Sequence, residues 1–215
     1  MSWRFIVFSA VLSLSVGLGS SAFGGTLWNS AVNGPLSTSG LAPTVLGPMT
    51  LGSNEVFAST GLNAAGVVDQ NYFTVTVPTG FALASLTELP GTQVGGLASF
   101  IGLEAGPQVT VGSNPATAAG LLGFTLYTPA DINTNILPSM AVAADGSSGF
   151  TAPLGPGQYS FWIQEGGTVG TFPFGFDLGL VSTAVPEPGT LTSSLIGLAI
   201  LSPAFLLRRR RRRLA

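Results

Sequence analysis

The sequence has no cysteine, no histidine and no lysine in its 215 residues. Without histidine, neither a Ser-His-Asp nor a Cys-His catalytic centre can form, and the usual zinc ligands, histidine and cysteine, are both missing. Without lysine there is no Schiff base, and without paired cysteines there is no disulfide framework. These absences remove whole classes of chemistry, and we expect no catalytic residues, no metal site, no cofactor and no enzymatic activity.

Charge is also scarce, because charged residues make up 7% of the chain against about 25% in typical soluble domains. The seven basic residues are Arg4 and an unbroken run near the C-terminus, so residues 5–207 carry no positive charge. Eight acidic residues are spread thinly between residues 25 and 184. Positive charge confined to the two ends predicts targeting signals rather than a nucleic-acid-binding face.

Residues 1–24 have the pattern of a secretory signal peptide. Arg4 precedes an apolar run over residues 5–18, and small residues follow it. Both Ala22 and Gly24 fit the small-x-small cleavage rule, and the pattern does not choose between them. The alternative is an uncleaved anchor, but the apolar run is short for a hydrocarbon core about 30 Å thick.

Residues 191–207 form an uncharged apolar segment of the minimum length for a membrane-spanning helix. Arginine is costly inside a bilayer, so the basic run that follows should stop translocation and stay in the cytoplasm. The alternatives for this run are a nucleic-acid patch or a solvated tail, and its direct contact with the apolar segment argues against both. The run consists of Arg208, Arg209, Arg210, Arg211, Arg212 and Arg213.

A proline-rich motif precedes the apolar segment, with Pro186 and Pro188 flanking Glu187. Two prolines remove two backbone donors and fix φ, so this motif should be extended and accessible at the outer membrane surface. The motif, the apolar segment and the arginine run over residues 185–215 together resemble the PEP-CTERM sorting signal. The resemblance implies export in an exopolysaccharide-producing Gram-negative bacterium and processing by a membrane-embedded exosortase. The physical alternative is a permanent membrane anchor.

Residues 25–184 should form the working domain. Strong helix formers are sparse, and apolar residues alternate with polar or small ones in stretches around 73–77, 122–126, 159–163 and 172–180. Short strands separated by Gly/Pro turns predict an all-β fold, a jelly-roll-like antiparallel β-sandwich. The residues that we expect to be largely buried are Phe73, Val75, Phe124, Phe161, Ile163, Phe174 and Phe176.

Weaker patterns predict further strands near 26–32, 54–59, 81–89, 97–103 and 107–111, and short helical turns within 116–122 and 129–137. Residues 34–52 are either a loose entry segment or an edge strand with loops. Residues 68–80 and 154–163 resemble strands of pre-peptidase C-terminal-type sandwich domains, which implies a sandwich fold and no particular ligand. The spacing between the two segments is longer here, and the aspartate-rich middle of that family is absent.

Two single residues carry competing interpretations. Asp145 begins an Asp-Gly-Ser sequence that fits a β-turn better than half of a calcium or protease motif. Trp162 lies on the polar side of its strand, where it is either an exposed platform for sugars or buried packing. Neither pattern identifies a ligand.

Three functional hypotheses therefore follow from the sequence. The first is an exported, exosortase-processed structural or adhesive protein of the cell surface, biofilm or extracellular matrix, in contact with exopolysaccharide. The second is an extracellular carbohydrate-active enzyme that uses two carboxylates, and the third is a carbohydrate-binding module. The missing histidine, lysine and cysteine favour the first. We expect the precursor to be anchored in the inner membrane and the mature form to lie outside the cell.

Overall fold

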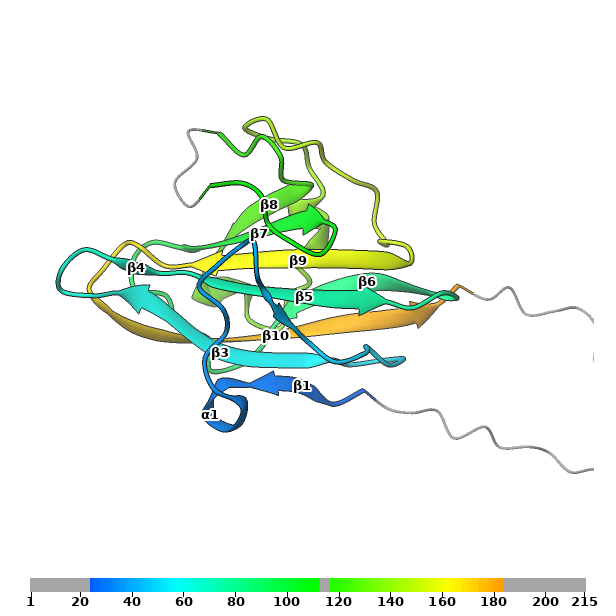
Figure 1. The fold of residues 1–215 in the computed structure, drawn as a ribbon, viewed down its shortest axis with the longest axis horizontal. Helices are drawn as coiled ribbons and strands as arrows, with labels where there is room; N and C mark the ends of the chain where they lie inside the picture. The colour runs from blue at the N-terminus through cyan, green and yellow to red at the C-terminus, as the bar shows by residue number, and fades with distance from the viewer. Residues whose placement is uncertain (1–23, 113–116, 184–215) are drawn as a thin grey trace, which may run out of the picture.

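The computed structural model describes residues 24–112 and 117–183. Within these residues nearly all regular structure is β-strand, and the helical pieces are single turns (Figure 1). This confirms the predicted all-β class. The strands form two sheets of five strands each, which lie face to face.

The first sheet, here called sheet A, has the strand order β1-β3-β10-β6, and β4 pairs with the end of β3. Its strands are β1 (Thr26–Asn29), β3 (Glu55–Leu62), β4 (Val68–Asp69), β6 (Phe81–Glu88) and β10 (Gly170–Ser182). The long strand β10 lies between β3 and β6 and pairs antiparallel with both.

The second sheet, sheet B, has the order β2-β5-β9-β7-β8. Its strands are β2 (Thr44–Val45), β5 (Asn71–Val77), β7 (Ser99–Ala105), β8 (Gly123–Tyr127) and β9 (Gly157–Gln164). The expectation of purely antiparallel sheets was wrong at two edges, because β1 pairs parallel with β3 and β2 pairs parallel with β5. The N-terminal segment adds β1 to an edge of sheet A and β2 to an edge of sheet B. The direction of each of these strands depends on the path by which the segment crosses from one sheet to the other.

The core lies between the two sheets. Phe73 of β5 stacks on Phe161 of β9 with ring centroids 5.0 Å apart. Across the layer, the rings of Phe176 on β10 and Tyr127 on β8 pack edge to face, with centroids 5.1 Å apart. Six of the seven residues predicted to be buried are so: Phe73, Val75, Phe161, Ile163, Phe174 and Phe176. Period-two alternation therefore identified the inward face of β5, β9 and β10.

The predicted register of β8 was wrong. Tyr127 points into the core, whereas Leu126 is 59% exposed and Phe124 is only half-buried. Phe124 instead stacks on Phe100 on the outer face of sheet B. Apolar residues cover this outer face as well, so β8 has apolar residues on both faces and its alternation does not identify the inner one.

Trp162 belongs to the layer of apolar side chains that packs on the outer face of sheet B. It is 1% exposed and contacts Tyr72 and Phe100, with ring centroids 5.8 and 4.8 Å away. Leu121 and Val109 complete this second apolar cluster. The interpretation of Trp162 as buried packing is therefore confirmed, and that of an exposed sugar platform is wrong.

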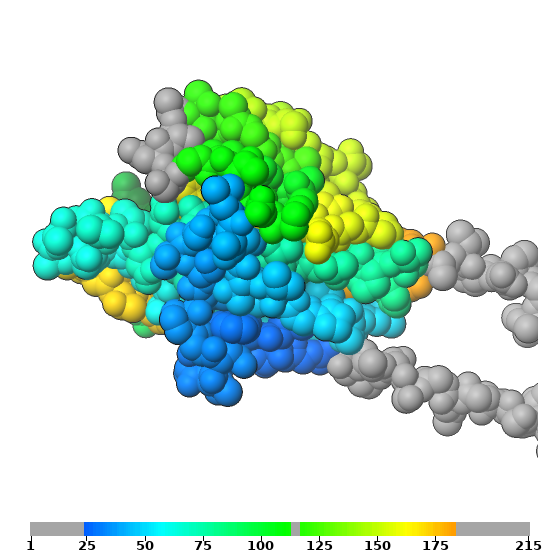
Figure 2. Space-filling view, viewed as in Figure 1, coloured from blue at the N-terminus to red at the C-terminus, as the bar shows by residue number. Residues whose placement is uncertain are grey.

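Two crossing segments close the sides of the layered structure. Residues 34–49 cross from sheet A to β2 of sheet B and turn back toward sheet A, over the face seen in Figure 2, and they bury Leu36, Leu46 and Met49 in the core. On the other side, residues 128–154 bring Ile136, Leu137 and Met140 of the short helix α2 (Leu137–Met140) and its N-cap into the same core. Both segments are therefore structural parts of the domain.

Local turn chemistry explains the remaining differences from the sequence-based expectations. β1 ends at Asn29 because its side chain accepts a hydrogen bond from the Ala31 amide and caps the helical turn α1 (Ser30–Asn33). A second turn, η1 (Pro129–Asp131), is held by a Thr128–Asp131 capping box. The expected helical turn fails over the described residues 117–122, and 107–111 form no strand.

Candidate functional site

The sorting residues predicted from the sequence, Pro186, Glu187, Pro188 and Arg208–Arg213, lie outside the described residues. So do residues 1–23 of the predicted signal peptide and the apolar segment 191–207. In the described ranges 24–112 and 117–183, no helix is long and apolar enough to cross a membrane.

Both ends of the described domain lie at the same end of the molecule. Gly24 packs so closely on Ser53 that a Cβ on Gly24 would collide with the Ser53 carbonyl. One residue earlier, Gly52 exchanges two backbone hydrogen bonds with Leu180, near the end of β10. In Figure 1, the start of β1 and the end of β10 both lie at the right. We call this the tail end of the domain.

The opposite end, the distal end, is formed by three loops. These loops comprise residues 63–67, 93–98 and 165–169, and the first connects β3 to β4 at the left of Figure 1. Three aliphatic side chains are exposed here: Val67, Leu97 and Val169, at 60%, 98% and 58%. The loops bring together residues that are up to about 100 positions apart in the sequence.

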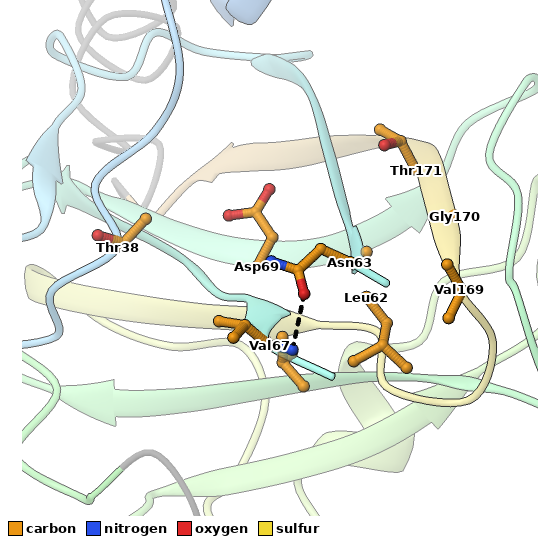
Figure 3. A pocket seen from close by; sticks show the side chains of 10 residues that line it. Thr38, Leu62, Asn63, Val67, Asp69, Val169, Gly170 and Thr171 are labelled. Carbon is orange, nitrogen blue, oxygen red and sulfur yellow. Dashed lines mark hydrogen bonds between the residues drawn. The ribbon is translucent and has the colours of Figure 1, made fainter. Parts of the chain in front are cut away.

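An open groove of about 650 Å³ lies at this distal end (Figure 3). Asp69 and Asn63 occupy its middle, with Thr38 on one side and Thr171 on the other. The lining residues are Thr38, Gly61, Leu62, Asn63, Val67, Val68, Asp69, Val169, Gly170 and Thr171. A smaller hollow of about 200 Å³ also has Asp69 in its wall, together with Ser30, Ser59 and Asn71. Asp69 therefore lines both hollows.

The polar groups of the groove are open to a ligand. Within the described residues, no hydrogen bond engages the Asp69 carboxylate or the hydroxyls of Thr38 and Thr171. Partial burial raises the pKa of Asp69 above its usual value. The Asn63 side-chain oxygen accepts hydrogen bonds from the Ala65 and Val67 amides, which leaves its NH₂ group as a donor.

The buried carboxylate of Glu165 holds two of the distal loops in place. One of its oxygens accepts hydrogen bonds from the Ser99 hydroxyl and the Gly95 amide, at 2.6 and 2.9 Å. The other accepts one from the Gly167 amide at 2.6 Å. The hydroxyl of Thr60 accepts a hydrogen bond from the Glu165 amide and donates one to the backbone oxygen of Asp69. Thr60 thereby links the backbone of Asp69, in the wall of the groove, to that of the buried Glu165.

A second buried carboxylate, Glu88, has a different environment. It is fully enclosed at the end of β6, and neither of its oxygens has a hydrogen-bond partner in the described residues. Burial, and secondarily the charge of Asp131, raises the pKa of Glu88 to about 7. The Tyr127 hydroxyl is also buried without a partner there, and burial raises its pKa. Glu88 and Glu165 are enclosed and do not face the groove lining.

Other acidic side chains hold local structure. Glu104 accepts hydrogen bonds from the amide and the hydroxyl of Thr110, and Asp177 accepts one from the Asn54 amide. Asp145 sits in a turn with a positive φ of 47°, as the sequence predicted. In the part of the chain that the structure describes, no three acidic side chains gather where they could hold a metal ion.

Sequence reasoning did not find the groove. Thr38, Asp69 and Thr171 lie on separate segments, and each is an ordinary polar residue in its own context. The pairing of β3 with both β4 and β10 brings Asp69 and Thr171 together, and a bridge between Ser37 and Tyr72 holds the segment of Thr38 next to the start of β5. No family model, curated protein or solved structure matches the chain.

Proposed function

We propose that the chain is an exported structural or adhesive protein of the cell surface or extracellular matrix, without catalytic activity. The observation that carries this proposal is the position of Gly24 and Leu180 on neighbouring residues, Ser53 and Gly52. A signal peptide and a sorting tail attached there both leave from one end of the domain. The distal loops and the groove then face away from the membrane.

In this proposal, the C-terminal residues 185–215 determine how the protein is sorted. Residues 191–207 hold the precursor in the inner membrane, and Arg208–Arg213 remain in the cytoplasm. An exosortase reads Pro186, Glu187 and Pro188 at the outer surface and removes the helix. The mature domain then lies outside the cell, in contact with exopolysaccharide. It binds no nucleic acid, because its eight acids have no base beside them.

The uses of the acidic residues support a non-catalytic role. Glu165, Glu104, Asp131 and Asp177 accept hydrogen bonds that hold turns and strand ends. A glycosidase needs two carboxylates on opposite sides of an accessible bond. Asp69 is the one acid that lines the two described hollows.

We propose further that the fold is a jelly-roll-like β-sandwich. The chain passes from β3 in sheet A to β5 in sheet B, and then through β6 and β7 in the same alternation. It returns through β9 and β10, each inserted between two earlier strands, as in a double Greek key. The two segments that resemble pre-peptidase C-terminal-type domains contribute the paired strands β5 and β9, which supports the same fold.

Fractionation of the native host tests the proposed processing. The chain is expressed in the host with and without its exosortase, and the membrane and matrix fractions are probed separately. The proposal predicts matrix material in the first strain and membrane-bound precursor in the second. Unchanged fractionation without the exosortase would contradict it.

A further inference from the structure

We propose that the groove around Asp69 is a binding site for an uncharged oligosaccharide. This inference rests on the proposed function for its setting, an exported domain whose distal end faces polysaccharide. The argument for the ligand itself comes from the lining of the groove, its charge and its shape.

The lining offers both hydrogen-bond donors and acceptors. The Asp69 carboxylate accepts only, the Asn63 NH₂ group donates only, and the hydroxyls of Thr38 and Thr171 do either. A sugar presents hydroxyl groups that also donate and accept, so it satisfies all of these groups together. An ammonium ligand would engage Asp69 but leave the Asn63 donors unmatched.

The groove also has an apolar component. Val67 and Val169 are exposed at 60% and 58%, and Val68 completes the wall. Aliphatic side chains beside a few directional polar groups suit the C–H faces of a sugar ring.

Charge excludes anionic ligands. No base occurs between residues 5 and 207, and the domain carries eight acids. A uronate or phosphate group would meet the Asp69 carboxylate with no cation to balance it. The ligand should therefore be neutral.

The shape favours several sugar units over one. The main groove of about 650 Å³ and the second hollow of about 200 Å³ both have Asp69 in their walls. That hollow adds the hydroxyls of Ser30 and Ser59, and Asp69 is the residue common to both. Asp69 should therefore contact the middle of a chain.

The test uses the full-length chain in an amine-oxide detergent, which has no sugar headgroup to compete. Saturation-transfer NMR measures binding of neutral hexasaccharides, namely β-1,4-glucan, α-1,4-glucan, β-1,4-mannan and α-1,6-glucan. Hexagalacturonate and the glucosamine hexamer serve as anionic and cationic comparisons. We expect at least one neutral hexasaccharide to bind with a dissociation constant below about 5 mM and hexagalacturonate not to bind.

Two variants with the same chemical change locate the site. Asp69→Asn should weaken binding at least tenfold, because it removes a charged acceptor whose side chain makes no hydrogen bond within the described domain. Asp145→Asn, on an exposed turn, should leave binding unchanged. Both variants should keep the thermal unfolding temperature of the parent.

Three results would overturn the inference: no binding of any neutral hexasaccharide, binding that Asp69→Asn does not weaken, or binding of the glucosamine hexamer alone. Each leaves the proposed export and processing untouched, because these are measured by fractionation of the host. Conversely, sugar binding by a protein that is never processed would overturn the proposed sorting and keep the groove.

Discussion

The Ser99 hydroxyl donates a hydrogen bond of 2.6 Å to the carboxylate of Glu165, and both residues are about 1% exposed. Ser99 begins β7, and Glu165 directly follows β9. The contact joins the start of one strand to the end of its neighbour, where the distal loops begin. Glu165 is thus the interior anchor of the distal end.

Replacement of Glu165 by glutamine should destabilise the domain by about 2–4 kcal/mol at pH 7, because hydrogen bonds to a charged group contribute about 1.5–3 kcal/mol each. Burial alone would raise the pKa of Glu165, but hydrogen bonds from Ser99, Gly167 and Gly95 lower it overall. A lowered pKa in the folded state gives stability that is present above the unfolded value and lost as the pH falls. The difference between the parent and the variant should therefore shrink in acid.

Urea denaturation of the full chain between pH 3 and pH 8 measures this effect. Glu104→Gln is the matched control, since Glu104 also accepts two hydrogen bonds but is more exposed. It should cost less than about 1 kcal/mol. Equal losses for the two variants would show that Glu165 is not an anchor.

Replacement of Glu88 by glutamine should have the opposite effect. Burial, with Asp131, raises the pKa of Glu88 to about 7. The pKa of this carboxyl in the unfolded chain is near 4.5. Because the pKa is higher in the folded state, the contribution of Glu88 to stability is fully present below pH 4.5 and is lost as the pH rises through 7. Glu88→Gln removes this loss, so it should stabilise the domain above pH 7 by up to a few kcal/mol, at about 1.4 kcal/mol per pKa unit.

The same denaturation series checks this prediction. The advantage of Glu88→Gln should be greatest at pH 8–9 and disappear near pH 4. A variant that is less stable than the parent at pH 8 would mean that the ionised carboxylate has a partner.

Phe161→Ala should cost about 3–5 kcal/mol, as expected for a large aromatic side chain removed from a packed core. Phe161 is fully buried and stacks on Phe73. Leu126→Ala is the control, because Leu126 is 59% exposed and should change stability by less than about 0.5 kcal/mol. A loss below 1 kcal/mol for Phe161→Ala would place β9 outside the core.

The arginine run should affect sorting and leave the fold unchanged. The described core residues all lie between Leu36 and Leu180, so serine at positions 208–213 should leave the domain's unfolding temperature the same. Serine should impair the membrane stop and the processing, whereas lysine at the same positions should preserve both. Normal processing of the serine variant would reduce the run to a solvated tail.

The parts of the fold that could be predicted are those where one face of a strand is apolar and the other is polar. In β5, Phe73 and Val75 alternate with threonines, and in β9 Phe161 and Ile163 alternate with Ser160, Trp162 and Gln164. The prediction failed for β8 because this strand carries large apolar residues at both alternating positions, with Phe124 and Leu126 at one and Tyr127 at the other. Local alternation cannot then decide between Phe124 and Tyr127.

Other features depend on contacts between distant segments. β1 pairs parallel with β3, and β2 pairs parallel with β5. Both pairings depend on the path of residues 34–49 across the domain, and no local sequence pattern encodes that path. Glu88 and Glu165 look like ordinary surface acids in the sequence, although both are buried. The groove likewise needs Thr38, Asp69 and Thr171 together, from three segments of the chain.

Intact-mass spectrometry of the protein from its native host tests the central claim most directly. The account predicts a mature species that has lost residues 1–22 or 1–24 and everything after a cleavage near Glu187. That species lacks all seven arginines of the precursor. A mature species that still contains residues 191–215 would contradict the account and identify a permanently anchored membrane protein.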